Sequence, residues 1–373
     1  MLTTSAAAQE APPNPKLVPP APLHEQILHL SGDPDRPVNL VVTVYTPMGT
    51  GPFPLAVINH GANGSSEKPA EMQRYRFTMA AYYFLSRGYA VALPMMRGYA
   101  GSGGAQTNHG CDLPEIALDN GRDIAGLIAS LAADPHIDTS RVVVAGQSFG
   151  GWNTLGLGAL QPDHVRGLIS FSGGVKSTAC IDERIGYRAL IQGAQRFGAN
   201  TQIPSIWFFG DNDSLFPKDV WRGMHQVYTQ AGASAELVDI GSFMNDSHQM
   251  LSYPEGIALL APKLDAFLQR IGLPHTEVQP AYMPTPTPPP THFAALEDIG
   301  AVPWVNAQSR ANYAQFLTAP LPRAFVIAPG GQSASAHDGF DPLSRALALC
   351  TQAGLACVPY AVDRTVVFVK PAG

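Results

Sequence analysis

Residues 24–272 alternate short apolar runs with longer amphipathic stretches. The apolar runs predict strands at residues 24–30, 38–45, 54–59, 89–94, 142–145, 165–171, 204–209 and 235–240. The stretches between them predict helices at residues 70–87, 115–133, 183–195, 218–231 and 254–271, and another helix can begin after Gly150. The first two strands are β-branched and joined by a short turn, which predicts an antiparallel pair. The remaining alternation is typical of an α/β fold with a doubly wound, mostly parallel sheet, covered by helices on both faces.

The composition changes at Leu273, which ends the predicted main domain of residues 23–272. Prolines crowd residues 274–290 and predict a linker with polyproline character at residues 273–291. Residues 292–373 have a pattern of their own and predict a small accessory α/β domain or a cap. Its expected helices are residues 307–317 and 342–353, and its expected strands are residues 324–328 and 357–369. His337 and Asp338 lie in a Gly- and Ser-rich stretch that we interpret as a solvated loop.

Residues 1–22 are rich in proline and alanine and predict a flexible segment. Ala6 and Ala8 resemble the end of a secretory signal cleaved before Gln9, although no charged or long apolar region precedes them. Two interpretations stay open, a signal-peptide remnant and a plain flexible tail. No apolar run reaches the length of about 18 residues that a membrane span needs.

The strand expected at residues 142–145 runs directly into Gly146-Gln147-Ser148-Phe149-Gly150, a G-x-S-x-G pattern. A serine on a sharp turn between strand and helix is held out of the sheet, and small residues at the glycine positions let the backbones approach closely. Taken alone, the pattern also fits an ordinary glycine-rich turn. With a strand before it and a helix after it, the pattern predicts that Ser148 is a nucleophile and that the Phe149 N–H faces a developing oxyanion.

A serine nucleophile needs a base and a carboxylate that orients the base. Asp213 and His248 each follow a predicted strand, so both should reach the rim formed by the carboxyl ends of the strands, beside Ser148. The Gly-rich loop after residues 54–59 lies at the same rim and would supply a second oxyanion donor, the N–H of Ala62. The chain order serine, aspartate, histidine therefore predicts acyl transfer to water.

Two acidic residues compete with Asp213. Asp211 lies nearer to the end of its strand, which favours Asp213 as the residue whose side chain turns towards the rim. Asp246 lies only two residues before His248 and is poorly placed to reach its Nδ1. His60, in the Gly-rich loop, is interpreted as a residue that shapes the loop and does not react.

Three large side chains are candidates for substrate binding: Met96 and Tyr99, in a long loop after the strand at residues 89–94, and Trp152, just after the serine turn. The same residues could equally belong to the core.

Four cysteines fit an exported protein with two disulfides, among three possible pairings. Cys350 and Cys357 bracket a helix end and the next strand, and we expect them to pair. Cys111 and Cys180 would then pair, since both lie in loops at the same rim. No C-x-x-C motif occurs, so neither a zinc ribbon nor a thioredoxin-type site is indicated.

The charge balance excludes some partners. Charged residues make up 14% of the chain, hydrophobic residues 45%, and the net charge is −6. This composition supports a full core and gives no sign of binding to nucleic acid or to an anionic membrane. It suits uncharged small substrates.

Five segments together resemble the dienelactone hydrolase-like and prolyl-oligopeptidase-like branch of the α/β-hydrolases, over roughly residues 24–272. They are H-G-A-N-G from His60, R-G-Y-A-G-S-G-G from Arg97, D-P-H-I-D-T-S-R-V-V-V-A-G-Q-S-F-G-G from Asp134, G-D-N-D-S-L-F-P from Gly210, and S-H at Ser247. The resemblance implies an α/β-hydrolase fold and a Ser/Asp/His triad, with no metal and no organic cofactor. Its G-x-x-D signature also supports Asp213 over Asp211.

Two departures from that branch narrow the expected activity. Dienelactone hydrolases carry cysteine as nucleophile where this chain has Ser148, which favours an ordinary carboxylesterase. No propeller precedes the domain, which disfavours a peptidase of the prolyl-oligopeptidase type.

The leading hypothesis is an exported serine esterase, periplasmic or secreted, for small or aromatic esters. Acylated sugars, feruloyl-type esters and polyester-like fragments are all possible small-molecule substrates. A peptidase or amidase with the same triad is the alternative, and a non-catalytic binding protein on a hydrolase scaffold is a third. The oligomeric state is not indicated.

Overall fold

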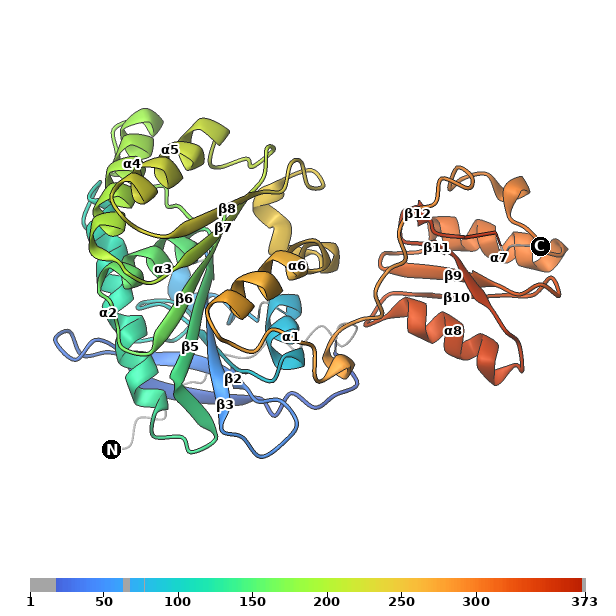
Figure 1. The fold of residues 1–373 in the computed structure, drawn as a ribbon, viewed down its shortest axis with the longest axis horizontal. Helices are drawn as coiled ribbons and strands as arrows, with labels where there is room; N and C mark the ends of the chain where they lie inside the picture. Colours follow the sequence, from blue (N-terminus) through green and yellow to red (C-terminus); the bar gives the residue numbers. More distant parts are fainter. Residues whose placement is uncertain (1–17, 63–67, 77, 371–373) are drawn as a thin grey trace. The chain divides into compact units, whose positions relative to one another are not determined.

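The computed structural model describes residues 18–62, 68–76 and 78–370. They form two compact units, one covering Ala21–Tyr282 and the other beginning at Met283 (Figure 1). The predicted flexible segment at residues 1–22 lies mostly outside the described residues.

The first unit is built on a sheet with the strand order β1-β2-β4-β3-β5-β6-β7-β8. The strands are β1 (Gln26–Ser31), β2 (Asn39–Tyr45), β3 (Phe53–Asn59), β4 (Ala90–Pro94), β5 (Ile137–Gln147), β6 (Val165–Phe171), β7 (Ser205–Phe209) and β8 (Ala235–Asp239). β2 pairs antiparallel with both β1 and β4, and all the other neighbours are parallel. The predicted doubly wound, mostly parallel sheet is confirmed.

Helices cover both faces of this sheet, with α1 and α6 on one face and α2 to α5 on the other (Figure 1). Their bounds are α1 (Thr78–Ser86), α2 (Leu113–Leu131), α3 (Phe149–Ala159), α4 (Glu183–Asn200), α5 (Lys218–Gln230) and α6 (Pro254–Arg270). The central strands are apolar throughout because helices cover them on both sides. In β5, for example, Val142, Val143 and Val144 are all completely buried.

The helix predicted at residues 70–87 is wrong in its first half. A short 3-10 helix, η2 (Pro69–Glu71), is followed by non-helical chain, and α1 begins only at Thr78. Side chains hold the intervening segment in place, because Tyr75 stacks on His60 and Arg74 lies 3.6 Å from a carboxylate oxygen of Glu25. These contacts override the helical periodicity of the sequence.

The second unit is a four-stranded antiparallel sheet in the order β10-β9-β11-β12. Its elements are α7 (Ala307–Thr318), β9 (Arg323–Ile327), β10 (Ser333–His337), α8 (Pro342–Gln352), β11 (Val358–Val362) and β12 (Thr365–Val366), with a 3-10 turn η5 (Ile299–Ala301) before them. Alternate residues of β9 face opposite ways, as expected of a strand. Phe325 packs in a cluster with Tyr313 of α7, and Val326 packs in a second cluster with Leu343 of α8.

Two predictions for the second unit need correction. The single strand expected at residues 357–369 is the hairpin β11–β12, because Asp363 adopts a left-handed backbone with φ 51° and its carboxylate accepts the Arg323 N–H at 2.8 Å. His337 is not in a loop, because it is the last residue of the edge strand β10, and Asp338 is the first residue after that strand. Small residues in Ser333–His337 hid this strand from a reading based on apolar content.

The expected linker at residues 273–291 makes contacts with the folded units at both of its ends. Leu273 is buried in the first unit, and Tyr282 donates its hydroxyl to the Pro22 carbonyl at 2.6 Å, while Thr291 donates its N–H to the Val366 carbonyl of the second unit at 3.1 Å. Polyproline backbone forms no internal hydrogen bonds, so its polar groups are free to bind neighbouring segments.

None of the helices that the structure describes combines the length and the apolar character of a transmembrane segment.

Candidate active site

Ser148 lies on the turn between β5 and α3, where the sequence predicts a nucleophile. Its backbone has φ 54° and ψ −120°, a strained conformation for a residue other than glycine. The Ser148 N–H donates to the Phe171 carbonyl of β6 at 2.8 Å, which holds the turn against the sheet. Both flanking glycines are needed: a Cβ at Gly146 would lie 2.2 Å from the Gly150 oxygen, and a Cβ at Gly150 would lie 2.1 Å from the Asn59 oxygen.

Asp213 and His248 meet beside this turn. Asp213 lies in the loop after β7, and His248 lies in the 3-10 segment η3 (Ser247–Ser252), which follows β8. The His248 Nδ1 is 3.1 Å from both carboxylate oxygens of Asp213. Their side chains are only 3% and 0% exposed. An Nδ1–H donated to Asp213 leaves Nε2 of a neutral His248 free to accept a proton.

The environment keeps Asp213 ionised. Burial acts to raise the pKa of Asp213, but the hydrogen bond and the charge of His248 lower it, as do two backbone donors. The donors are the N–H groups of Leu215 and Phe216, at 2.9 and 3.0 Å from Oδ1. The net pKa of Asp213 lies below its ordinary value, so a carboxylate faces His248 at neutral pH.

Neighbours of Ser148 connect it to the two other loops of the site. The Gln147 side chain donates to the His248 carbonyl at 3.1 Å. A Cβ at Gly61 would lie 2.6 Å from the Gln147 Oε1 and 3.3 Å from the Ser148 Cβ. The histidine loop and the loop that carries Ala62 therefore both lie against the serine turn.

The two expected oxyanion donors are open. Within residues 18–62, 68–76 and 78–370, neither the Phe149 N–H nor the Ala62 N–H donates a hydrogen bond. Phe149 is the first residue of α3, where backbone donors have no partner inside the helix and favour negative charge. The rest of the Gly-rich loop, Asn63 to Ser66, lies outside the described residues.

His60 is buried and holds the Ala62 loop in place. Its Nε2 accepts the Met96 N–H at 2.9 Å, and its Nδ1 donates to the Gly61 carbonyl at 2.7 Å. The ring stacks on Tyr75 and meets the Tyr99 ring edge-on. Burial lowers the pKa of His60 to about 4, so the imidazole is neutral and can accept from Met96. This arrangement fits the loop-shaping role expected from the sequence.

The three candidates for substrate binding are all largely buried. Trp152 is fully covered, and its indole N–H donates to the Leu113 carbonyl at 2.9 Å. Met96 and Tyr99 are each 7% exposed and belong to the same apolar cluster. Of the three, only Met96 and Tyr99 keep any exposed surface.

The competing carboxylates have other partners. Asp211 is ion-paired with Lys218 at the surface. The Asp246 carboxylate accepts the His248 backbone N–H at 2.9 Å, whereas the ring Nδ1 of His248 faces Asp213. Sequence reasoning weighed Asp246 only as an acid and passed over Gln147, although Gln147 is the first variable position of the G-x-S-x-G pattern.

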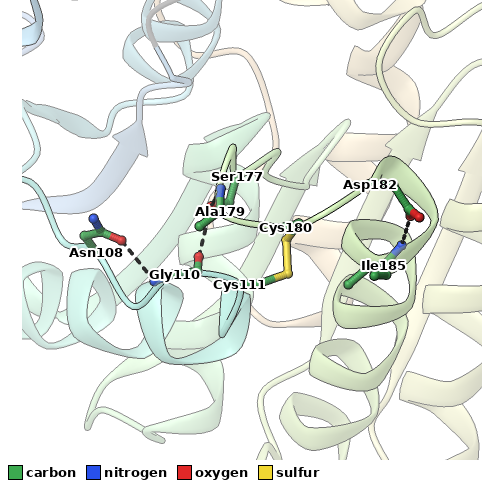
Figure 2. Close-up of a disulfide and its surroundings, with 8 residues drawn as sticks. All are labelled: Asn108, Gly110, Cys111, Ser177, Ala179, Cys180, Asp182 and Ile185. Atoms are coloured by element: carbon green, nitrogen blue, oxygen red, sulfur yellow. Dashed lines mark hydrogen bonds between the residues drawn. A yellow bond between two sulfur atoms is a disulfide. The ribbon is translucent and has the colours of Figure 1, made fainter.

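Both expected disulfides are present, Cys111–Cys180 and Cys350–Cys357. The first joins the start of α2 to the loop that follows β6, just before α4 (Figure 2). Beside it, Ser177 donates its hydroxyl to the Gly110 carbonyl at 2.9 Å, so a hydrogen bond reinforces the covalent link. Among the described residues, no group of three or more His, Cys, Asp or Glu side chains is arranged to hold a metal ion.

Comparison with known families matches part of the chain. The sequence profile of the X-Pro dipeptidyl-peptidase (S15) family matches residues 35–186, fewer than half of the chain. The matched segment contains Ser148 and ends before Asp213 and His248. No curated protein matches the chain in sequence.

Several solved structures are similar in fold at low sequence identity. An esterase from Pyrococcus furiosus shares 15% identity over 67% of this chain and 91% of its own, with a TM-score of 0.48. An acylaminoacyl peptidase from Pyrococcus horikoshii shares 17% identity over 68% of this chain and 43% of its own, with a TM-score of 0.47. A puromycin-hydrolysing peptidase from Mycobacterium tuberculosis shares 18% identity over 66% and 40%, with a TM-score of 0.46.

Proposed function

We propose that this chain, a serine hydrolase of the α/β-hydrolase fold, hydrolyses small or aromatic carboxylic esters through Ser148, His248 and Asp213. The observation that carries the proposal is the buried pair of His248 and Asp213, with its Nδ1-to-carboxylate distances of 3.1 Å, next to a serine in a strained turn. A buried imidazole paired with a carboxylate is rare among residues that only pack in a core, and it is common where a histidine acts as a general base.

The reaction would proceed through an acyl-enzyme. The Ser148 Oγ attacks the ester carbonyl while His248 Nε2 takes the hydroxyl proton, and a tetrahedral oxyanion forms. His248 returns that proton to the departing alkoxide as the bond between the carbonyl carbon and the alcohol oxygen breaks. A water molecule, deprotonated by His248, then attacks the acyl-enzyme carbonyl. As the bond between the acyl carbon and Ser148 Oγ breaks, His248 returns the proton to Oγ, and the acid and the free serine are released. Asp213 stabilises the imidazolium in both halves of the cycle.

The N–H groups of Phe149 and Ala62 would bind the oxyanion. Neither donates to an acceptor among the described residues, so no bond to those residues has to break when the oxyanion forms. Loss of one such donor costs about 3–4 kcal/mol of transition-state stabilisation in other hydrolases. The fixed position of His60 therefore supports catalysis through the loop that carries Ala62.

Ester and amide hydrolysis are the two candidates. The profile match to a peptidase family favours amide hydrolysis. Ester hydrolysis is chemically easier, because an alkoxide leaves more readily than an amine. Paired substrates with one acyl group, a nitrophenyl ester and the matching nitroanilide, separate the two. We expect ester cleavage with kcat/KM at least about 100-fold above that for the anilide, lost in S148A. Anilide cleavage at an equal rate would identify a peptidase or amidase.

Three kinds of small-molecule ester belong to the proposed substrate class. Acylated sugars, feruloyl-type esters and polyester fragments all offer an uncharged ester next to apolar or aromatic groups, which suits a rim where Met96 and Tyr99 are proposed to contact substrate. A non-catalytic binding protein is the remaining reading, and the retention of all three triad residue types argues against it.

The proposed location is an exported one, the periplasm or the extracellular space. The chain has four cysteines, and all four are paired in two disulfides, one in each unit. Such disulfides persist in oxidising compartments and are rare in the cytosol.

A further inference from the structure

Two separate loops supply the histidine and the carboxylate of the proposed triad. The acid loop, residues 210–217, follows β7, and the base loop, residues 241–248, follows β8. We infer that Asp246 is a positioning residue that joins these loops and fixes His248 against Asp213. This inference rests on the proposed hydrolase function and deepens it.

A single carboxylate binds both loops. Oδ1 of Asp246 accepts the His248 N–H at 2.9 Å and the Ser214 N–H at 3.1 Å, and Oδ2 accepts the Ser214 hydroxyl at 2.8 Å. Ser214 directly follows Asp213 in the chain. The carboxylate therefore holds the backbone of one triad residue and that of the immediate neighbour of the other.

These bonds close a ring with the triad contact. One side of the ring is the Nδ1–H of His248 bound to Asp213, and the other is Asp246 bound to Ser214. With the triad contact alone, the imidazole could pivot about the Asp213 carboxylate while keeping its hydrogen bond. The second link holds the His248 backbone relative to the acid loop, so it restricts this pivoting of the imidazole.

Other contacts between the loops lie farther from the ring. Asn212 accepts the Phe243 N–H at 3.0 Å and donates to the Met244 carbonyl at 3.1 Å. These bonds hold the beginning of the base loop, where Met244 has a left-handed backbone with φ 49°. Asp246 bonds to the N–H of His248 and also to the acid loop, whereas Gln147 of the serine turn bonds to the His248 carbonyl, so we assign the positioning role between the loops to Asp246.

Steady-state kinetics on a nitrophenyl ester test the inference. In D246A, all three hydrogen bonds are lost, and we expect kcat to fall about 30-fold or more with KM within about 3-fold, since a misplacement of about 1 Å costs about 100-fold in rate. In D246N, one oxygen remains for both backbone N–H groups, and kcat should stay within about 5-fold of wild type. This conservative variant separates the hydrogen bonds from the negative charge.

The matched control is D298A. Asp246 is the N-cap of the 3-10 segment η3, and Asp298 is likewise the N-cap of the 3-10 helix η5, where it accepts the Ala301 N–H at 3.1 Å, but Asp298 lies in the second unit. Loss of this cap should leave kcat and KM unchanged. If kcat fell as far in D298A as in D246A, the loss in D246A would reflect general destabilisation of the fold and not the positioning of His248, and the inference would be overturned.

A double-mutant cycle with D213N decides whether Asp246 acts through the pair. If it does, adding D246A to D213N lowers kcat by less than about 3-fold, because the contact that Asp246 aligns is already impaired. Full multiplication of the two effects would overturn the inference. If D246A does not fold, as judged by circular dichroism, S214A removes the hydroxyl bond alone and should lower kcat about 2- to 5-fold; an unchanged kcat there contradicts the inference.

Failure of the proposed function is distinguishable from failure of the inference. A folded wild-type protein that cleaves no ester refutes the function and the inference with it. An active wild-type protein whose D246A variant keeps the wild-type kcat refutes the inference alone.

Discussion

His60 offers the sharpest test of the electrostatics beside the site, through the pH dependence of stability. The ring is fully buried, and its Nε2 accepts the Met96 N–H, so the folded chain requires the neutral imidazole. Substitution by glutamine keeps an oxygen that can accept from Met96 and removes the titrating group. The comparison of wild type with H60Q therefore isolates the proton equilibrium of one side chain.

The magnitude follows from the pKa difference between the two states. The pKa of His60 is about 4 in the folded chain and about 6.5 in the unfolded chain. Above about pH 6.5, the ring is neutral in both states and titration costs nothing. As the pH falls towards 4, the unfolded chain gains a proton that the folded chain cannot hold, and stability is lost. The loss amounts to about 2 kcal/mol at pH 5 and about 3 kcal/mol below pH 4.

Urea unfolding at several pH values between 8 and 5 provides the measurement. H60Q should be the less stable protein at pH 8, because it lacks the ring contacts with Tyr75 and Tyr99. The gap in unfolding free energy should then shrink by about 2 kcal/mol at pH 5. The other histidines and the second unit are common to both proteins and cancel in the difference. Parallel stability curves for the two proteins would refute a buried, neutral His60.

Three further predictions test the acid, the disulfides and the serine turn. D213N should lower kcat by about 100-fold or more in ester hydrolysis, and D211N by less than about 3-fold, because Asp211 is paired with Lys218; a larger loss in D211N would reassign the acid. The pKa of Asp213 is lower in the folded chain than its ordinary value. The carboxylate therefore stabilises the fold above about pH 4, and this contribution is lost as the pH falls through the folded pKa. In D213N, the unfolding free energy should accordingly fall less steeply with acid than in the wild type. A disulfide that closes a longer loop restricts the unfolded chain more. Removal of Cys111–Cys180, with a sequence separation of 69, should therefore lower the unfolding free energy by about 4 kcal/mol, and removal of Cys350–Cys357, with a separation of 7, by about 2 kcal/mol. Equal losses in denaturant unfolding would contradict this argument. G150A should destabilise the chain by about 2–4 kcal/mol and abolish ester hydrolysis, because its Cβ would lie 2.1 Å from a backbone oxygen. The control G223A, on helix α5, should be neutral or stabilising, because its Cβ would meet the flexible side chain of Ile191. Unaltered thermal stability in G150A would contradict the close approach.

Hydrophobic periodicity located every strand of the first unit, because buried parallel strands are apolar along their whole length and differ plainly from amphipathic helices. It failed where single side chains set the backbone. Residues 72–76 follow the contacts of Arg74 and Tyr75 instead of the helical pattern. Ser333–His337 forms an edge strand whose serine and alanine residues carry too weak an apolar signal to predict it. Pattern alone cannot see contacts between segments that are distant in the chain.

The site shows the same division. Ser148, Asp213 and His248 were predicted from strand ends, because parallel topology brings these ends to one rim, and the structure places His248 against Asp213. The roles of Gln147 and Asp246 depend on hydrogen bonds across 101 and 32 positions of sequence, which no local pattern encodes. Trp152 follows the serine turn closely in sequence, yet α3 directs its ring into the core against Phe197, 4.8 Å between ring centroids.

The central claim is that Ser148 is the nucleophile of an ester hydrolase, and covalent labelling tests it most directly. Folded wild-type protein treated with a fluorophosphonate should gain one phosphonyl group per chain, located on Ser148 by peptide mass spectrometry. Ester hydrolysis should disappear in proportion to labelling, and S148A should neither react nor hydrolyse. Labelling at another residue, or ester hydrolysis that persists after complete modification of Ser148, would contradict the account.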